Sequence, residues 1–235
     1  RGIVGTIGST GQGVGEATVD KIRRGGARLA KDHTYLRVGD TREYLERKMS
    51  SGARVMMEGT QGTLLSLHHG YYPFVTSRDT AASGTLGEMG IPPGRVNRSI
   101  MVCRTNPIRV QSPDGGTSGP MGVELTWEDI ARRSGMGADE LREIERTTTT
   151  KRLRRIGEFS FAQLQRACLL NAPTDIALTF VDYVSVMNRG ATQYRQLTAE
   201  THDFINHIET VARAPVSLIS TGFTRTSFID RRRSW

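Results

Sequence analysis

Residues 58–84 gather side chains that could bind a charged ligand, EGTQGTLLSLHHGYYPFVTSRDTAASG. They follow an apolar run at 53–57, which predicts a buried strand. In open α/β sheets, ligands bind outside the carboxyl ends of strands. The polar side chains after this run, with Gly59 and Gly62 between them, therefore predict a binding site at a strand end. A polar loop whose hydroxyl groups only cap turns is the alternative.

A second group of chemically active side chains lies at residues 147–155, TTTTKRLRR. Hydroxyl groups followed by arginines can hold a carboxylate or a phosphate through charge-assisted, often bidentate hydrogen bonds. The run therefore predicts an anion site. A solvated basic loop is the alternative interpretation.

A glycine-rich loop precedes both stretches, within residues 2–15, GIVGTIGSTGQGVG. This stretch predicts a short strand and a loop, followed by a helix at 16–24. The N–H groups at the start of a helix can bind an anion. No lysine follows at the spacing of a complete phosphate-binding P-loop, and a purely structural turn is the alternative.

Composition limits the class of protein. The chain has 235 residues, of which 37% are hydrophobic and 24% charged, and a net charge of +8. No apolar run approaches the roughly 18 residues of a membrane span, and no signal-peptide pattern opens the sequence. Cys103 and Cys168 lie in apolar contexts, without disulfide or zinc spacing. These features predict a reduced, cytoplasmic setting and no metal site among the histidines.

The positive charge permits nucleic-acid binding but does not favour it. The arginines concentrate at 23–28, 142–155 and 231–233 rather than along one identifiable face. A pocket for several phosphates and carboxylates accounts equally well for a basic chain.

Alternating strands and helices predict an α/β fold with a largely parallel central sheet flanked by helices, as one domain over residues 1–235. Residues 231–235 are expected to form a disordered basic tail. Besides those above, the expected strands are 36–38, 99–103, 176–181 and 216–220, and the expected helices are 40–50, 80–90, one from 126, 139–146, 160–171 and 200–213.

The first stretch resembles the core signature of adenylosuccinate synthetases, EGxQGTLLDxxHGxYPxVTSSNTTAGG. These enzymes join aspartate to a 6-oxopurine nucleotide with a nucleoside triphosphate. Arg78 and Asp79 replace Ser-Asn of the pattern, and Ser83 replaces a glycine. The residues that keep the pattern are Glu58 to Leu65, His69, Gly70, Tyr72, Pro73, Val75, Thr76 and Ser77.

The resemblance implies an acceptor-nucleotide site. The loop IGSTGQGVG is similar to the family's IGTTGRGIG, in which Thr10 fills the position that holds the nucleotide's monophosphate. Arg24 fills the position of an arginine donated by the neighbouring subunit, which implies a homodimer. The implied acceptor-binding residues are Ser9, Thr10, Arg24, Gln61, Thr76, Ser77, Asp79 and Val110.

The arginine run resembles the family's aspartate loop, TTGRxRRxGWLD, with Lys151 in place of a glycine. The resemblance implies that Thr149, Thr150 and Arg152 bind aspartate. It implies that Arg154 bridges aspartate and the triphosphate.

Two further motifs resemble the family's triphosphate site. Asp182 keeps the acid of a TKLD motif, whereas Phe180 replaces its lysine. Ser220 and Gly222 keep an STG motif, and Phe223 replaces the proline that follows it. Arg154, Asp182, Ser220 and Gly222 are therefore expected at the triphosphate. The retained Asp182 by itself favours guanine, whereas the loss of the lysine and the arrival of Phe223 favour ATP or dATP over GTP as donor.

The implied function is a ligase that condenses L-aspartate with a purine nucleotide. One branch looks closest, the phage 2-aminoadenylosuccinate synthetases, which use dGMP. An ordinary IMP-dependent synthetase, or a non-catalytic nucleotide- or nucleic-acid-binding module, is the alternative. The family's catalytic carboxylate, histidine and Mg²⁺ ligands precede the glycine loop, so they are expected upstream of Arg1 in a longer protein.

Overall fold

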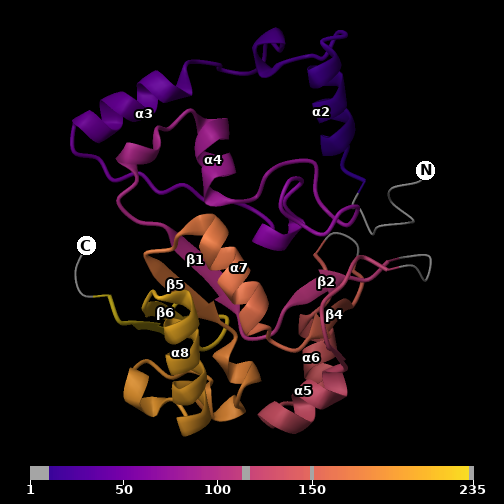
Figure 1. Cartoon of the computed structure of the whole chain (residues 1–235), viewed down its shortest axis with the longest axis vertical. Coiled ribbons are helices and arrows are strands. Elements are labelled where there is room, and N and C mark those ends of the chain that lie inside the picture. The colour runs from indigo at the N-terminus through magenta and orange to yellow at the C-terminus, as the bar shows by residue number, and fades with distance from the viewer. Residues whose placement is uncertain (1–10, 113–116, 149–150, 233–235) are drawn as a thin grey trace. The chain divides into compact units, whose positions relative to one another are not determined.

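The structure is a computed structural model that describes residues 11–112, 117–148 and 151–232 (Figure 1). The described chain forms two compact units, Gly11–Asn97 and the part from Arg98 onward.

A four-stranded sheet in the order β1-β5-β6-β7 is the centre of the second unit. β1, β5 and β6 are parallel, and β7 runs antiparallel to β6. The largely parallel sheet expected from the sequence is confirmed. The strands are β1 (Ile100–Arg104), β5 (Asp175–Thr179), β6 (Val216–Ser220) and β7 (Phe228–Asp230).

Helices α7 (Phe161–Asn171) and α8 (Ala199–Ala212) pack on this sheet, as Figure 1 shows. Their apolar faces and the strands form one hydrophobic core. Ile205 and Ile208 of α8 are fully buried, as the helical spacing of apolar residues predicts. Ser160 caps α7 by accepting from the Gln163 N–H, as its capping-box spacing predicts.

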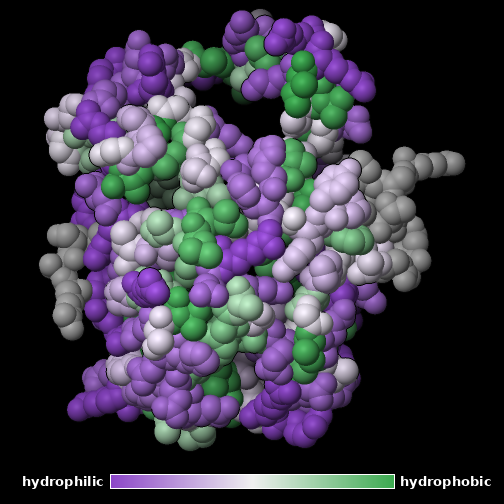
Figure 2. Space-filling model, in the orientation of Figure 1, coloured by the Kyte–Doolittle hydropathy of each residue, from purple (hydrophilic) through white to green (hydrophobic). Residues whose placement is uncertain are grey.

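A second, antiparallel sheet in the order β2-β4-β3 was not expected from the sequence. Its strands are only two to four residues long, too short for a clear alternating pattern. Helices α5 and α6 pack beside it. In the view of Figure 2, hydrophilic residues predominate over α5. The elements are β2 (Ile108–Val110), β3 (Glu124–Leu125), β4 (Arg154–Gly157), α5 (Trp127–Ser134) and α6 (Ala138–Ile144).

The unit Gly11–Asn97 is built from helices and turns. Asp40 caps α3 by accepting from the Glu43 N–H at 3.0 Å, as predicted. The helices are α2 (Val14–Arg23), α3 (Thr41–Ser50) and α4 (Ala82–Met89), and the 3₁₀ turns are Ala30–Asp32, Thr63–Leu65 and Pro93–Arg95.

Two strands expected in this unit are not formed. Residues 36–38 and 53–57 have no strand pairing in the described part of the chain. Met56 is 89% exposed, so the second run is not buried either. An apolar run becomes a strand only where a partner supplies its backbone hydrogen bonds, which local composition cannot reveal.

The expected disorder of the terminal arginines is wrong for Arg231 and Arg232. Arg231 donates to Glu209 at 3.0 Å and to the Val216 carbonyl at 2.8 Å, and its guanidinium lies 4.1 Å from the Tyr194 ring centre. Arg232 pairs with Asp230. Glu209, 22 residues away, holds Arg231, and the neighbouring Asp230 holds Arg232, so specific partners order charges that composition alone predicted to be disordered.

None of the helices within the described ranges is long and apolar enough to cross a membrane.

Replacing Leu178 by alanine should destabilise the core of the second unit by about 2–5 kcal/mol, because the removed side chain leaves a cavity. Leu178 is fully buried, whereas Leu169 on α7 is 82% exposed. Urea unfolding monitored by circular dichroism measures both variants. Leu169→Ala is the control, and an equal effect of the two changes would contradict this assignment of the core.

Candidate functional site

Gln61 and Thr76, 15 positions apart in sequence, are in direct contact in the first unit. The Gln61 amide donates to the Thr76 hydroxyl at 2.8 Å. Backbone bonds from Thr76 to the Leu65 carbonyl and from Leu67 to the Arg78 carbonyl, at 2.8 and 3.0 Å, hold the two segments side by side. These segments are turns, so the expected placement of this site at a strand end is wrong.

Asp79 fixes the same loop. Its Oδ1 accepts from the Ser66 hydroxyl at 2.8 Å and from the Ala81 N–H at 3.0 Å, at the start of α4. Burial opposes ionisation, but these two hydrogen bonds and the nearby His69 and His68 hold the pKa of Asp79 below its usual value. Asp79 is therefore a carboxylate that ties the loop to α4.

Gly84 shows how tightly this carboxylate is packed. A Cβ added to Gly84 would lie 2.7 Å from the Asp79 Cβ, closer than side chains approach one another. Glycine is therefore required on the face of α4 that Asp79 covers.

Ser77, Arg24 and Arg78 are three further residues of this unit that lie in the family-like motifs. Ser77 lies beside the start of α2, where a Cβ on Gly15 would be 3.8 Å from the Ser77 Cβ. Arg24 ends α2 in a left-handed conformation and is exposed. Arg78 forms an ion pair with Glu88. Ser9 and Thr10 lie outside the described residues.

In the second unit, Ser220 is the last residue of β6, and Asp182 and Gly222 lie just beyond the carboxyl ends of β5 and β6, where open α/β sheets bind ligands. Leu178 of β5 pairs with Ile219 of β6, so the two strand ends are adjacent. The Ser220 hydroxyl donates to the Gly222 carbonyl at 3.0 Å and shapes the turn that follows β6.

Asp182 is 1% exposed, in the 3₁₀ turn Val181–Tyr183. Burial raises the pKa of its carboxyl group, and the Arg189 guanidinium, 3.6 Å from Oδ2, opposes this shift. Oδ2 accepts no hydrogen bond from any described residue. A buried acceptor without a donor is costly, and this one lies at the predicted base site.

Phe180 and Phe223 differ in their availability to a ligand. Phe180 adopts φ 63°, and the Arg104 guanidinium lies 3.6 Å from its ring centre and covers one face. Phe223 is 65% exposed and meets Phe180 edge-on, with ring centres 5.9 Å apart. Phe223 is thus the accessible aromatic surface of this pair.

The arginine run leads into β4, since Arg152 precedes the strand and Arg154 and Arg155 begin it. The Thr147 N–H donates to the Arg152 carbonyl at 2.8 Å, and the Arg152 N–H returns a bond to the Thr147 hydroxyl at 3.0 Å. Val110 of β2 pairs with Arg154 of β4, so the sheet brings together two predicted site residues. Thr149 and Thr150 lie outside the described residues.

Glu145 is the site residue that the sequence did not predict. It is 1% exposed and accepts from Arg104 Nη2 and from the Tyr183 hydroxyl, both at 2.6 Å. Its other oxygen lies 3.3 Å from Arg154 Nη1. A lone glutamate at a helix end carries no sequence signal, because its partners come from three distant segments.

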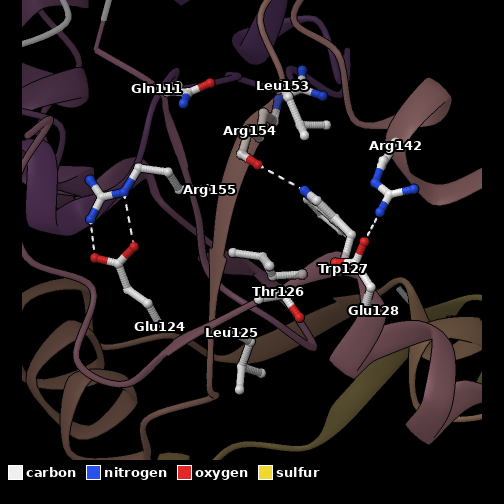
Figure 3. Close-up of a pocket in the computed structure, with 11 residues that line it drawn as sticks. Gln111, Glu124, Leu125, Thr126, Trp127, Glu128, Arg142, Leu153, Arg154 and Arg155 are labelled. Atoms are coloured by element: carbon white, nitrogen blue, oxygen red, sulfur yellow. Dashed lines mark hydrogen bonds and ion pairs between the residues drawn. The ribbon is translucent and has the colours of Figure 1, made fainter. Parts of the chain in front are cut away.

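A pocket of about 260 Å³ lies beside β4 (Figure 3). The Trp127 indole N–H donates to the Arg154 carbonyl at 3.0 Å across it, and Arg142 pairs with Glu128. Arg155 pairs with Glu124, which lowers the pKa of that carboxyl group, so Arg155 supports the β3 strand rather than a ligand.

No group of three or more His, Cys, Asp or Glu side chains able to hold a metal ion occurs among the described residues. No metal step is therefore assigned to this part of the chain.

Comparisons with known proteins identify the family of the chain. The family model for adenylosuccinate synthetase matches residues 30–189. The chain therefore belongs to the adenylosuccinate synthetase family. It is 41% identical over 228 residues to the adenylosuccinate synthetase of Methanocaldococcus jannaschii, with 96% of this chain and 62% of that protein covered. The chain spans about 62% of the length of this curated relative.

Two solved structures share the fold. Cyanophage S-2L succinoaminodeoxyadenylate synthetase, bound to dGMP and dATP, matches with a TM-score of 0.75 and 32% identity over 97% of this chain and 63% of its own. Plasmodium falciparum adenylosuccinate synthetase matches with a TM-score of 0.71 and 20% identity. The match covers 83% of this chain and 54% of the Plasmodium chain.

Asp182→Asn should raise the melting temperature at pH 7. Because burial raises the pKa of Asp182, the ionised form is less stable in the folded protein than in the unfolded chain. This destabilisation is present at pH 7 and disappears as the pH falls to the ordinary value of 3.8. The gain in melting temperature should therefore shrink from pH 7 to pH 4. The exposed Asp203→Asn on α8 is the control, and a lower melting temperature for Asp182→Asn at pH 7 would show that the Arg189 pair dominates.

Proposed function

We propose that the full-length protein is a C–N ligase that joins L-aspartate to a purine nucleotide, driven by a nucleoside triphosphate. In the family's reaction the γ-phosphoryl group moves to the purine O6, and the aspartate amine then displaces phosphate. Positioning and charge neutralisation supply most of the catalysis in such transfers. The observation that carries the proposal is the arginine run on β4, with Arg154 set against Val110 on the neighbouring strand.

Arg152 is the proposed ligand of the aspartate carboxylate. It precedes β4, and its guanidinium has no hydrogen bond or ion pair to a residue in the described ranges. Arg154 keeps 25% of its side chain exposed, with Nη1 directed to Glu145 and to the Arg146 carbonyl. Arg154 is thus held in place, as suits the proposed bridge between aspartate and triphosphate.

We assign dGMP as the acceptor. The synthetase of cyanophage S-2L, 32% identical to this chain, was solved with dGMP. Asp79 supports this proposal, because it accepts a hydrogen bond from Ser66 and so orders the loop that carries Gln61 and Thr76. This loop, supported by Asp79 in place of the asparagine of the family pattern, would then distinguish guanine from hypoxanthine by its geometry. Asp79 itself would form no direct bond to the guanine 2-amino group.

IMP is the second candidate acceptor, because the chain is 41% identical to an archaeal adenylosuccinate synthetase. The two candidates differ only in the acceptor nucleotide, so the ligase chemistry is common to both.

The proposed donor is ATP or dATP. Phe180 occupies the position of a lysine in the family. The guanidinium of Arg104 lies over the Phe180 ring, so it does not replace the lysine charge beside the nucleotide base. Phe223 offers an exposed ring for stacking, and Asp182 Oδ2 can accept from an adenine amino group once the base reaches it. A homodimer, the role of Arg24 in it, the Mg²⁺ requirement and a cytoplasmic location stay predictions.

Arg152→Ala in the full-length protein should raise the KM for aspartate by roughly 10- to 100-fold, the effect of losing one charge-assisted hydrogen bond. Steady-state kinetics with saturating nucleotides measure it. Arg195→Ala, at an exposed position, is the matched control. An unchanged KM for aspartate would remove Arg152 from the site.

The full-length protein should prefer dGMP to IMP in kcat/KM by about tenfold or more, because a site shaped for the 2-amino group loses pairing when that group is missing. A grid of both acceptors against ATP, dATP and GTP, with phosphate release as the signal, measures this preference and the donor together. Preference for IMP would identify the protein as an ordinary adenylosuccinate synthetase, and preference for GTP would show that Asp182 still selects guanine.

A further inference from the structure

The carboxylate of Glu145 connects the two halves of the proposed site in the second unit. One partner, Arg104, ends β1 in the parallel sheet; another, Arg154, opens β4 in the antiparallel sheet. The third, Tyr183, ends the 3₁₀ turn that contains Asp182. Glu145 itself follows α6, so four separate segments meet at one side chain.

The geometry of these contacts leaves Glu145 little freedom. Oε1 receives two hydrogen bonds of 2.6 Å, from Arg104 and Tyr183, and Oε2 faces Arg154 at 3.3 Å. The Arg154 N–H also donates to the Glu145 carbonyl at 2.9 Å, which fixes the backbone of β4 beside the end of α6. Burial raises the pKa of Tyr183, and its bond to Glu145 adds to the shift, so the hydroxyl remains a donor at neutral pH.

Arg104 extends the connection to the base side of the site. Its guanidinium stacks on Phe180 at 3.6 Å and lies 5.7 Å from the Tyr183 ring centre. A planar guanidinium can bond a carboxylate and stack on a ring at once, which a lysine cannot do. Moving Glu145 would therefore displace Arg154 and the Phe180–Tyr183 segment together.

We infer that Glu145 is a positioning residue that sets Arg154, at the aspartate end, and Phe180, at the donor-base end, through one buried carboxylate. The inference rests on the proposed function, since it uses the roles assigned there to both ends. It adds a residue that contacts neither substrate and predicts that the two binding steps respond together.

The test compares Glu145→Gln with the wild type in the full-length protein. The glutamine keeps the shape but not the charge. It should raise the KM for aspartate and for the triphosphate together, each by about tenfold, with less than about twofold change for the acceptor nucleotide. A merely structural role would reduce the folded fraction, which lowers kcat and leaves every KM unchanged. Glu143→Gln is the matched control, because Glu143 lies in the last turn of α6, two residues before Glu145, and its side chain is 84% exposed.

Arg104→Lys keeps the positive charge and separates the two ends. It should raise the KM for the triphosphate and leave the KM for aspartate within about twofold, since it loses the stacking on Phe180 while Arg154 keeps its contact with Glu145. This variant also keeps the inference testable if Glu145→Gln does not fold. Unchanged KM values for the triphosphate in Arg104→Lys would overturn the inference.

Fluorescence gives a readout that does not depend on activity. Trp127 bonds the Arg154 carbonyl, so its emission reports on the start of β4 in a background in which every other tryptophan of the full-length protein is replaced by phenylalanine. Glu145→Gln should shift this emission to longer wavelength at unchanged far-ultraviolet circular dichroism. Wild-type emission, with wild-type KM values, would overturn the inference. A wild-type enzyme that consumes no aspartate would instead refute the proposed function, while a shifted emission would still support the positioning role.

Discussion

A single buried carboxylate, Glu145, joins four separate segments of the second unit and so constrains its architecture. Removing a charge from water costs several kcal/mol, and only well-placed partners offset this cost. Two arginines and a tyrosine hydroxyl provide those partners, from β1, β4 and the turn after β5. The short antiparallel sheet and the parallel sheet are consequently held in one relation by electrostatics as well as by packing.

This constraint explains how two buried polar groups of the second unit can lack a hydrogen-bond partner. Asp182 is buried with one oxygen lacking a hydrogen-bond donor, and Arg104 has a buried Nε without a partner in the described structure. Buried polar groups are usually satisfied, so such exceptions call for a functional explanation. A rigid frame around Glu145 lets these groups persist, because the rest of the network is well paired and resists collapse around them.

In the first unit, a partly buried carboxylate also orders the chain, but through fewer hydrogen bonds. It has few buried apolar side chains, and its loop is ordered by backbone bonds and by Asp79, whose carboxylate takes two hydrogen bonds. Only glycine fits at position 84 beneath it. The replacement of Ser-Asn by Arg78 and Asp79 therefore changes the support of the loop as well as its charge, since Arg78 pairs with Glu88 on α4.

The sequence by itself determined the elements whose signals are local. Capping residues such as Asp40 and Ser160, the apolar periodicity of α8 and the strands β5 and β6 all follow from short-range chemistry, and the motifs indicated the family. Only the tertiary structure decided the rest. Whether an apolar run such as 53–57 pairs as a strand, and which charges meet a buried glutamate, depends on segments far apart in the chain. Hydrogen-bond partners and burial are properties of the folded molecule, so local composition could predict the Arg154 motif but not the carboxylate that holds it.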